Sequence, residues 1–100
     1  MTLDELTQFM KMIAPRASSM NAVLKFDFGA DGVIHLDATQ SPAAVSNEDS
    51  PADTIVSVSL SDFADILQKK LPGDLAFAMG KLRVSGDMIT GVRLTQILNR

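Results

Sequence analysis

Between residues 22 and 38 the sequence largely alternates between apolar and polar side chains, with a break at residues 29–32. A period of two is that of an extended strand, in which successive side chains point to opposite faces. The break reads Gly-Ala-Asp-Gly, and glycine and aspartate favour tight turns. We therefore predict a β-hairpin. Its apolar face carries Ala22, Leu24, Phe26, Phe28, Ile34, Leu36 and Ala38.

The amino end predicts a helix that stops before this hairpin. Thr2 and Glu5 have the spacing of a capping box, in which each side chain bonds the other residue's backbone amide. Pro15 disfavours helical geometry at the residue before it, so residues 16–20 should form a connector. Apolar residues recur at helical spacing at Leu3, Leu6, Phe9, Met10 and Ile13.

After the hairpin, residues 39–53 are polar and contain two prolines and three carboxylates. Such long stretches without secondary structure are uncommon in compact domains and are usually functional or disordered. We predict a long mobile loop. Residues 54–60 return to alternation and predict a strand, with Val56, Val58 and Leu60 on one face and Ser57 and Ser59 on the other.

Two short helices are predicted next. Ser61 is a good N-cap for a helix that ends at Lys69 and Lys70, where cationic side chains suit the carbonyl end. Asp74 should cap one or two further helical turns that end at Gly80.

The pair Gly80-Lys81 raises the question of a phosphate-binding loop. That motif needs G-x-x-x-x-G-K-[ST] after a strand and before a helix. Gly73 lies too far upstream, and Leu82 stands where Ser or Thr should bind magnesium. We interpret Gly80 as the end of a helix and residues 81–85 as a short strand.

The last helix is predicted to follow a turn at Gly86, with Asp87 as its cap. Its apolar residues are Met88, Ile89, Val92, Leu94, Ile97 and Leu98.

Charge and composition exclude several classes of function. The net charge of -3 and the pI of about 4.8 argue against nucleic acid as a partner. They also argue against steady binding to an anionic membrane through a basic patch. The absence of cysteine excludes disulfides, thiolate metal sites and a cysteine nucleophile.

Length and hydropathy set the remaining expectations about organisation. One hundred residues suffice for one core, so a single domain over residues 1–100 is expected. No apolar run approaches the ~20 residues of a transmembrane helix, so stable membrane insertion is not expected. The amino end lacks the apolar run of a signal peptide, and a cytoplasmic location is the default expectation.

His35 is the only histidine, so a zinc site would lack ligands. A Ser-His-Asp arrangement is conceivable, since Ser57 or Ser59 could lie on the strand next to His35 and Asp37. Alternation alone, however, places these side chains on the solvent side of a sheet. We expect solvated surface here and no catalytic residues.

The carboxylates of the polar loop do not predict a metal site either. Glu48, Asp49 and Asp53 lack the Asp-x-Asp-x-Asp-Gly spacing of a calcium loop. We therefore expect no metal and no cofactor.

The apolar side chains leave two interpretations open. All five phenylalanines, together with Met10, Met79 and Met88, fall on positions that the periodicities predict to face inward. Such a set is normally core. Methionine also suits surfaces that adapt to varied ligands, so a ligand cavity is the second interpretation.

A resemblance to a known family rests on the run Ser61-Asp62-Phe63, the two lysines before Pro72-Gly73, and Leu75-Ala76-Phe77. The stretch GKLRVSGDM at residues 80–88 and the closing amphipathic helix extend it. In these features residues 54–98 resemble the sterol carrier protein 2 family of lipid-binding domains, and the hairpin fits the family's first two strands more loosely.

The resemblance implies an α+β fold: a mixed, mainly antiparallel sheet of about five strands with helices over one face. Between sheet and helices it implies an apolar tunnel that holds fatty acids, fatty acyl-CoA, sterols or other lipids without chemical change.

Carried over by position, the tunnel would be approached by Phe63, Leu67, Phe77, Met79, Leu82 and Val84. Met88 and Val92 would cover one end of it. The weaker half of the match adds Phe9, Met10, Ile13, Phe26 and Ile34 to the wall. Met79 stands where the family often has a polar residue, so this site should be more apolar. The peroxisomal tripeptide of eukaryotic members is missing, which suggests a bacterial-type stand-alone domain.

Two functions from different classes follow. The first is non-enzymatic binding of a fatty-acyl, sterol-like or isoprenoid-like lipid. The alternative is an assembly module, for example a homodimer or an accessory factor in lipid or quinone metabolism, whose core is filled by its own side chains. An exposed apolar stripe around Ile89 and Leu94 would favour the alternative.

Overall fold

The computed structural model describes the backbone of residues 1–98 and the side chains of residues 1–17 and 20–94. Its strands are β1 (Val23–Asp27), β2 (Val33–Asp37), β3 (Ala44–Ser46), β4 (Thr54–Val58) and β5 (Leu82–Gly86). Its α-helices are α1 (Leu3–Ile13), α2 (Leu60–Leu67), α3 (Gly73–Ala78) and α4 (Met88–Leu98). Two 3-10 helices complete the elements, η1 (Ala14–Met20) and η2 (Gly29–Asp31).

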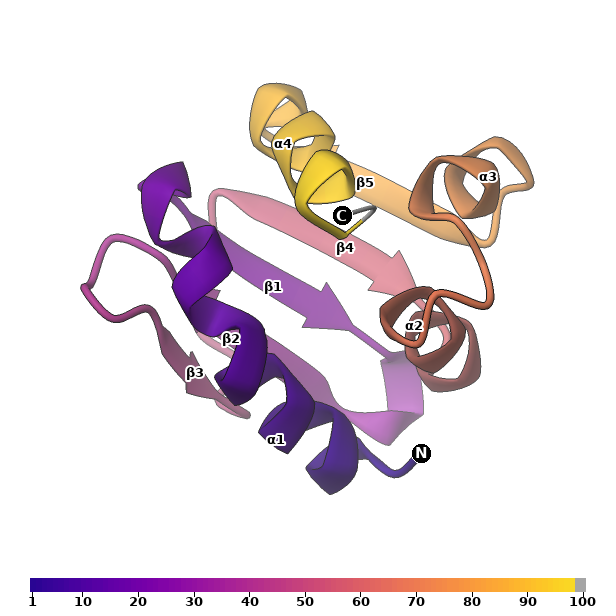
Figure 1. Cartoon of the computed structure of the whole chain (residues 1–100), viewed down its shortest axis with the longest axis horizontal. Helices are drawn as coiled ribbons and strands as arrows, with labels where there is room; N and C mark the ends of the chain where they lie inside the picture. Colours follow the sequence, from indigo (N-terminus) through magenta and orange to yellow (C-terminus); the bar gives the residue numbers. More distant parts are fainter. Residues whose placement is uncertain (99–100) are drawn as a thin grey trace.

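The strands form one sheet in the order β3-β2-β1-β4-β5. β1 and β4 run parallel, and the other neighbouring pairs are antiparallel. Helices α1, α2 and α4 lie over one face, and α3 lies at a corner beside the edge strand β5 (Figure 1). The predicted α+β class, with a five-stranded, mainly antiparallel sheet and helices over one face, is confirmed.

The predicted hairpin is β1 and β2, with Phe26 opposite Ile34. The residues of its predicted apolar face are buried, because this face packs under the helices. The turn between the strands is η2, which begins at Gly29 (φ 64°) and is followed by Gly32 (φ 108°). These backbone angles favour glycine, which explains the Gly-Ala-Asp-Gly break.

The capping box at the start of α1 is also confirmed. The Thr2 amide donates to Glu5 Oε1 at 3.0 Å, and the Glu5 amide donates to Thr2 Oγ1 at 3.2 Å. Helix α1 ends before Pro15 as predicted, but the expected connector is wrong. The chain continues directly as the 3-10 helix η1, whose first turn accepts proline because the amide there needs no partner.

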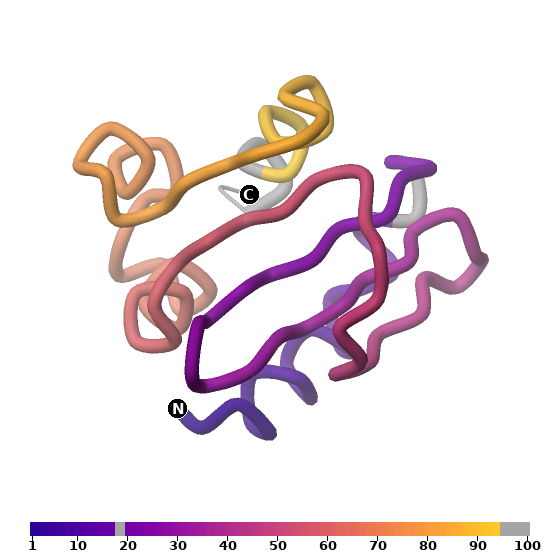
Figure 2. The backbone as a smooth tube through the Cα atoms, turned by 180° about the vertical axis from the view of Figure 1, so that it is seen from behind, coloured from indigo at the N-terminus to yellow at the C-terminus, as the bar shows by residue number. Residues whose placement is uncertain are grey.

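The long mobile loop predicted at residues 39–53 is corrected by the structure. It contains β3, which pairs with β2. The following residues cross the outer face of the sheet, where Asp49 bonds Lys25 at 2.7 Å and His35 Nε2 lies 3.0 Å from the Pro51 carbonyl (Figure 2). The prediction failed because these partners come from distant strands, which composition does not reveal.

The N-cap of α2 is Ser59 rather than Ser61. Strand β4 already ends at Val58, and the Ser59 hydroxyl accepts the Asp62 amide at 3.0 Å. Asp74 is likewise not a cap, since α3 begins at Gly73. Gly80 (φ 76°) does end the helical segment as predicted.

The turn from β5 into α4 is built by Gly86 and Asp87, as predicted. Gly86 has φ 87°, and a Cβ there would lie 2.3 Å from the Asp53 carbonyl oxygen. The Asp87 carboxylate accepts the Ile89 amide at 3.0 Å and the Thr90 hydroxyl at 2.9 Å. The side chains of Ile97 and Leu98, predicted for the apolar set of this helix, lie outside the described residues.

Candidate functional site

The centre of the helix-covered face is filled by aromatic side chains. The Phe63 ring of α2 lies 4.8 Å from the Phe26 ring and 5.4 Å from the Phe28 ring, centroid to centroid. Phe26 and Phe63 are fully buried. Such tilted aromatic pairs stabilise a packed core beyond the area they bury.

The structure divides the predicted lipid-site residues into three groups. The buried group is Met10, Phe26, Ile34, Phe63, Leu67 and Leu82. The half-buried group, packed against the core, is Phe9, Ile13 and Val84. The exposed group is Phe77, Met79, Met88 and Val92.

The inward positions predicted for Phe77, Met79 and Met88 are therefore wrong. Helix α3 is only six residues long and buries Gly73 and Ala76. Its remaining positions turn away from the sheet, because one short helix covers a neighbour with one face only.

Helix α4 exposes apolar residues for a related reason. Its described buried residues are Thr90, Gly91 and Leu94, which share one helical face. Met88, Ile89 and Val92 fall on the opposite face. The apolar residues of this helix thus occupy more than one face, and contact through a single face cannot bury them all.

Together these residues form what we term the α3–α4 apolar surface: Leu75, Phe77, Met79, Met88, Ile89 and Val92. Between 47% and 71% of each residue is exposed. Leu75 and Ile89 were absent from the residues predicted by family position. A signal in the sequence could have identified them. Each of these helices has apolar residues on more than one face, so some of these residues must stay exposed.

Close packing places α4 against the edge strand. A Cβ added at Gly91 would lie 2.6 Å from Val84 Cγ1, so the helix backbone lies directly against β5. The buried Thr54 hydroxyl donates to the Asp87 carbonyl at 2.9 Å and joins β4 to the start of the helix. Helix α4, which carries part of the α3–α4 apolar surface, is thus held against the strand pair β4 and β5.

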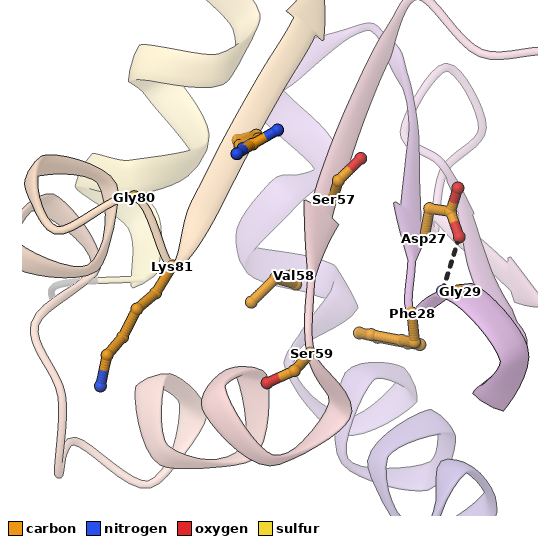
Figure 3. A pocket seen from close by; sticks show the side chains of 9 residues that line it. Asp27, Phe28, Gly29, Ser57, Val58, Ser59, Gly80 and Lys81 are labelled. Atoms are coloured by element: carbon orange, nitrogen blue, oxygen red, sulfur yellow. Dashed lines mark hydrogen bonds between the residues drawn. The ribbon is translucent and has the colours of Figure 1, made fainter.

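An open polar depression of about 470 Å³ lies where β1 and β4 end and β5 begins. Figure 3 shows the Asp27 carboxylate there, which accepts the Gly29 amide at 2.8 Å. Its lining combines carboxylate, hydroxyl and cationic side chains with two apolar ones: Asp27, Phe28, Gly29, Ser57, Val58, Ser59, Gly80, Lys81 and Arg83. None of these residues is a histidine that could activate a serine.

The conceivable Ser-His-Asp arrangement does not form. Ser57 lies on β4 and His35 on β2, and β1 runs between them rather than the two strands being neighbours. Strands are about 4.8 Å apart, so two spacings exceed hydrogen-bond reach. Instead the His35 ring bonds the Pro51 carbonyl.

Titratable groups with shifted pKa values serve local turns. The Thr39 hydroxyl, the Gln40 amide and the Thr39 backbone lower the pKa of Asp37. The Thr2 backbone amide, followed by the Thr2 hydroxyl, lowers the pKa of Glu5. Within the described residues, no group of three His, Cys, Asp or Glu side chains is placed to hold a metal ion. No described helix is long and apolar enough to cross a membrane.

The sheet order and the helices over one face define a small α+β domain, a fold that a solved sterol carrier protein structure shares. The model of the SCP-2 sterol transfer family matches residues 3–99, and the chain belongs to this family. Its domain is typically a non-enzymatic, lipid-binding fold.

Individual proteins resemble the chain over most of its length. Hydroxysteroid dehydrogenase-like protein 2 of Danio rerio is 29% identical over 92 residues, which are 87% of this chain and 22% of that protein. The chain thus spans about a fifth of this relative's length.

Two solved structures share the fold. Sterol carrier protein 2 from Yarrowia lipolytica, in its apo form, has a TM-score of 0.70 and 22% identity, covering 95% of this chain and 84% of that one. Palmitated SCP2L2 from Aedes aegypti has a TM-score of 0.70 and 23% identity, covering 100% and 96%.

Proposed function

We propose that this chain binds a lipid without changing it chemically, and that the apolar part of the lipid packs against the α3–α4 apolar surface. One observation carries the proposal. Of the eight exposed large apolar side chains among the described residues, six belong to this surface. Apolar exposure gathered on neighbouring elements is typical of a binding site, whereas scattered apolar residues need no explanation.

The chemistry of the surface favours a flexible apolar ligand. Met79 and Met88 adapt their shape readily, and Phe77 offers a large apolar face. Each methylene that leaves water contributes about 0.8 kcal/mol, so a fatty-acyl chain gains substantially from this contact. Family membership and the palmitated structural neighbour support a fatty acid, a fatty acyl-CoA, or a sterol-like or isoprenoid-like lipid as the ligand class.

We further propose that the exposed residues form the entrance of an apolar tunnel. Val84, half-buried on β5 beneath α4, would lie at its floor, and Leu82 continues the strand into the core. The buried and half-buried residues predicted from the family would then form its deeper wall: Phe9, Met10, Ile13, Phe26, Ile34, Phe63 and Leu67.

A matched pair of substitutions tests the proposal. Met88→Asp places a charge in the proposed entrance, and Met12→Asp places the same charge on α1, where 68% of Met12 is exposed. Uptake of a fluorescent fatty acid should weaken at least about tenfold in Met88→Asp, because a desolvated charge readily costs the 1.4 kcal/mol of a tenfold change.

The control Met12→Asp should take up the fatty acid like the unmodified chain. Both residues are exposed, so both variants should keep their melting temperature. Equal uptake by the two variants would refute the placement of the ligand. A native mass spectrum of the purified chain, followed by extraction, would show whether lipid co-purifies and name its class.

Ile89 favours the second candidate function, an assembly module. It is 71% exposed, and such a side chain at the start of a helix suits a protein partner. The exposed stripe around Ile89 and Leu94 that would favour this function is only half present, since Leu94 is buried. A homodimer that dissociates in Ile89→Asp, together with no lipid uptake by the unmodified chain, would favour this alternative.

A further inference from the structure

The cationic residues of the chain are concentrated next to α3. Four of the nine lie between residues 69 and 83, together with a single acidic residue. This segment therefore carries +3, whereas the rest of the chain carries -6. The overall net charge of -3 conceals a local reversal of sign.

Three side chains of this cluster are available to a partner. Lys70, Lys81 and Arg83 are exposed, and none forms an ion pair with any residue that the structure describes. Lys25, in contrast, is paired with Asp49. Figure 3 shows Lys81 extending from the start of β5 beside Gly80.

Apolar side chains lie between these cations in the sequence. Leu75, Phe77 and Met79 are about half exposed on and just after α3. Both backbone views place α3 at a corner of the molecule, beside the edge strand (Figures 1 and 2). A protruding apolar element flanked by cations is complementary to a bilayer, which offers an apolar interior beneath anionic headgroups.

The placement of the apolar residues favours a bilayer over a protein partner. Leu75 and Met79 are four residues apart and share a helical face, whereas Phe77 lies on another side of the short helix. A rigid protein surface would contact one of these faces. Fluid lipid can surround the helix and contact both.

We infer that the segment of residues 69–83, which we term the α3 corner, docks on anionic membrane surfaces. Leu75, Phe77 and Met79 enter the interfacial region, and Lys70, Lys81 and Arg83 contact phosphate headgroups. The docking is peripheral. The inference rests on the proposed function and deepens it, because it names the anionic membrane as the source from which the chain takes its lipid.

Vesicle sedimentation tests this inference. The probes are vesicles of phosphatidylcholine alone and vesicles with an equal amount of phosphatidylglycerol. The unmodified chain should sediment with the anionic vesicles, and added salt should weaken the binding. The double variant Lys81→Gln/Arg83→Gln should bind about 25-fold more weakly, since each cation near such a surface contributes about fivefold.

A matched double variant provides the control. Lys11→Gln/Arg16→Gln removes two exposed cations from α1 and η1 and should bind anionic vesicles like the unmodified chain. Leu75→Ser should weaken binding severalfold, whereas Met12→Ser should not. Equal sedimentation with both kinds of vesicle, or equal losses in the two double variants, would overturn the inference and leave an acidic protein as the partner of the α3 corner.

Lipid uptake without vesicles separates the two proposals. Lys81→Gln/Arg83→Gln should take up fluorescent fatty acid normally, because neither residue belongs to the proposed entrance. Loss of vesicle binding with normal uptake in this variant is the expected result. Vesicle binding by an unmodified chain that takes up no fatty acid would refute the lipid site but retain the docking surface.

Discussion

The first two and the last two α-helices of the chain differ in how far their apolar residues are buried. Helix α1 and helix α2 bury theirs in the aromatic core, where Leu6 and Phe63 are fully buried. Helices α3 and α4 leave half or more of Phe77, Met88 and Ile89 in solvent. Both pairs of helices accompany the same sheet, so the difference comes from the helices themselves.

The cause is the distribution of apolar residues around each helix. In α1, the apolar residues other than the exposed Met12 share one face, so a single contact with the sheet covers them. In α4, apolar residues occupy opposite faces, and contact through Gly91 buries only one of them. A helix with more apolar residues than its neighbours can cover points to a binding surface.

The largest expected effect comes from making the same change in both regions. Phe63→Ala should lower the free energy of unfolding by about 3–5 kcal/mol, because it opens a cavity in the aromatic core. Phe77→Ala should lower it by about 1 kcal/mol or less, because half of this side chain is already in water. Urea denaturation measures both losses. Similar values would contradict the division into a closed region, α1 and α2 over the aromatic core, and an open region, α3 and α4.

Gly91→Ala tests how closely α4 packs on β5. The added methyl group would lie 2.6 Å from Val84 Cγ1, and the resulting strain should cost about 1–3 kcal/mol. The higher helix propensity of alanine would offset at most about 1 kcal/mol of this cost. A net gain in stability, measured by thermal melting, would show that α4 does not press against the strand.

The corrected start of α2 predicts a smaller effect in the closed region. Ser59→Ala removes the hydroxyl that accepts the Asp62 amide and should cost about 1 kcal/mol. Ser61→Ala, two residues later, should be almost neutral because its side chain is exposed. Urea denaturation of the pair distinguishes them, and the reverse order would restore Ser61 as the cap.

The smallest effect is a pH dependence confined to the open region. The Thr90 hydroxyl, followed by the backbone amides of Thr90 and Ile89, holds the pKa of Asp87 below its ordinary value. The carboxylate therefore stabilises the start of α4 above the ordinary aspartate range, and this contribution is lost as the pH falls through the lowered pKa. Amide exchange at Ile89 should accelerate there, and Asp87→Asn should abolish that pH dependence.

Much of the fold could be predicted because its signals are local. The hairpin of residues 22–38, the Thr2 capping box, and the turns at Gly80 and Gly86 depend on residues within a few positions of one another. The prediction of one sheet with helices over one face came from the resemblance to the family. The candidate site was predicted less well, since Leu75 and Ile89 were missed and Phe77 and Met88 were expected to face inward.

By itself, the sequence determined most of the places where the chain extends, coils and turns, although not β3 or η1, because those preferences arise from backbone geometry and from the spacing of neighbouring side chains. Only the tertiary structure decided that β4 lies parallel beside β1, that residues 47–53 cross the outer face to Lys25 and His35, and which face of α4 is buried. These features depend on contacts such as Gly91 with Val84. Their partners are set by packing of the whole domain, which no local pattern contains.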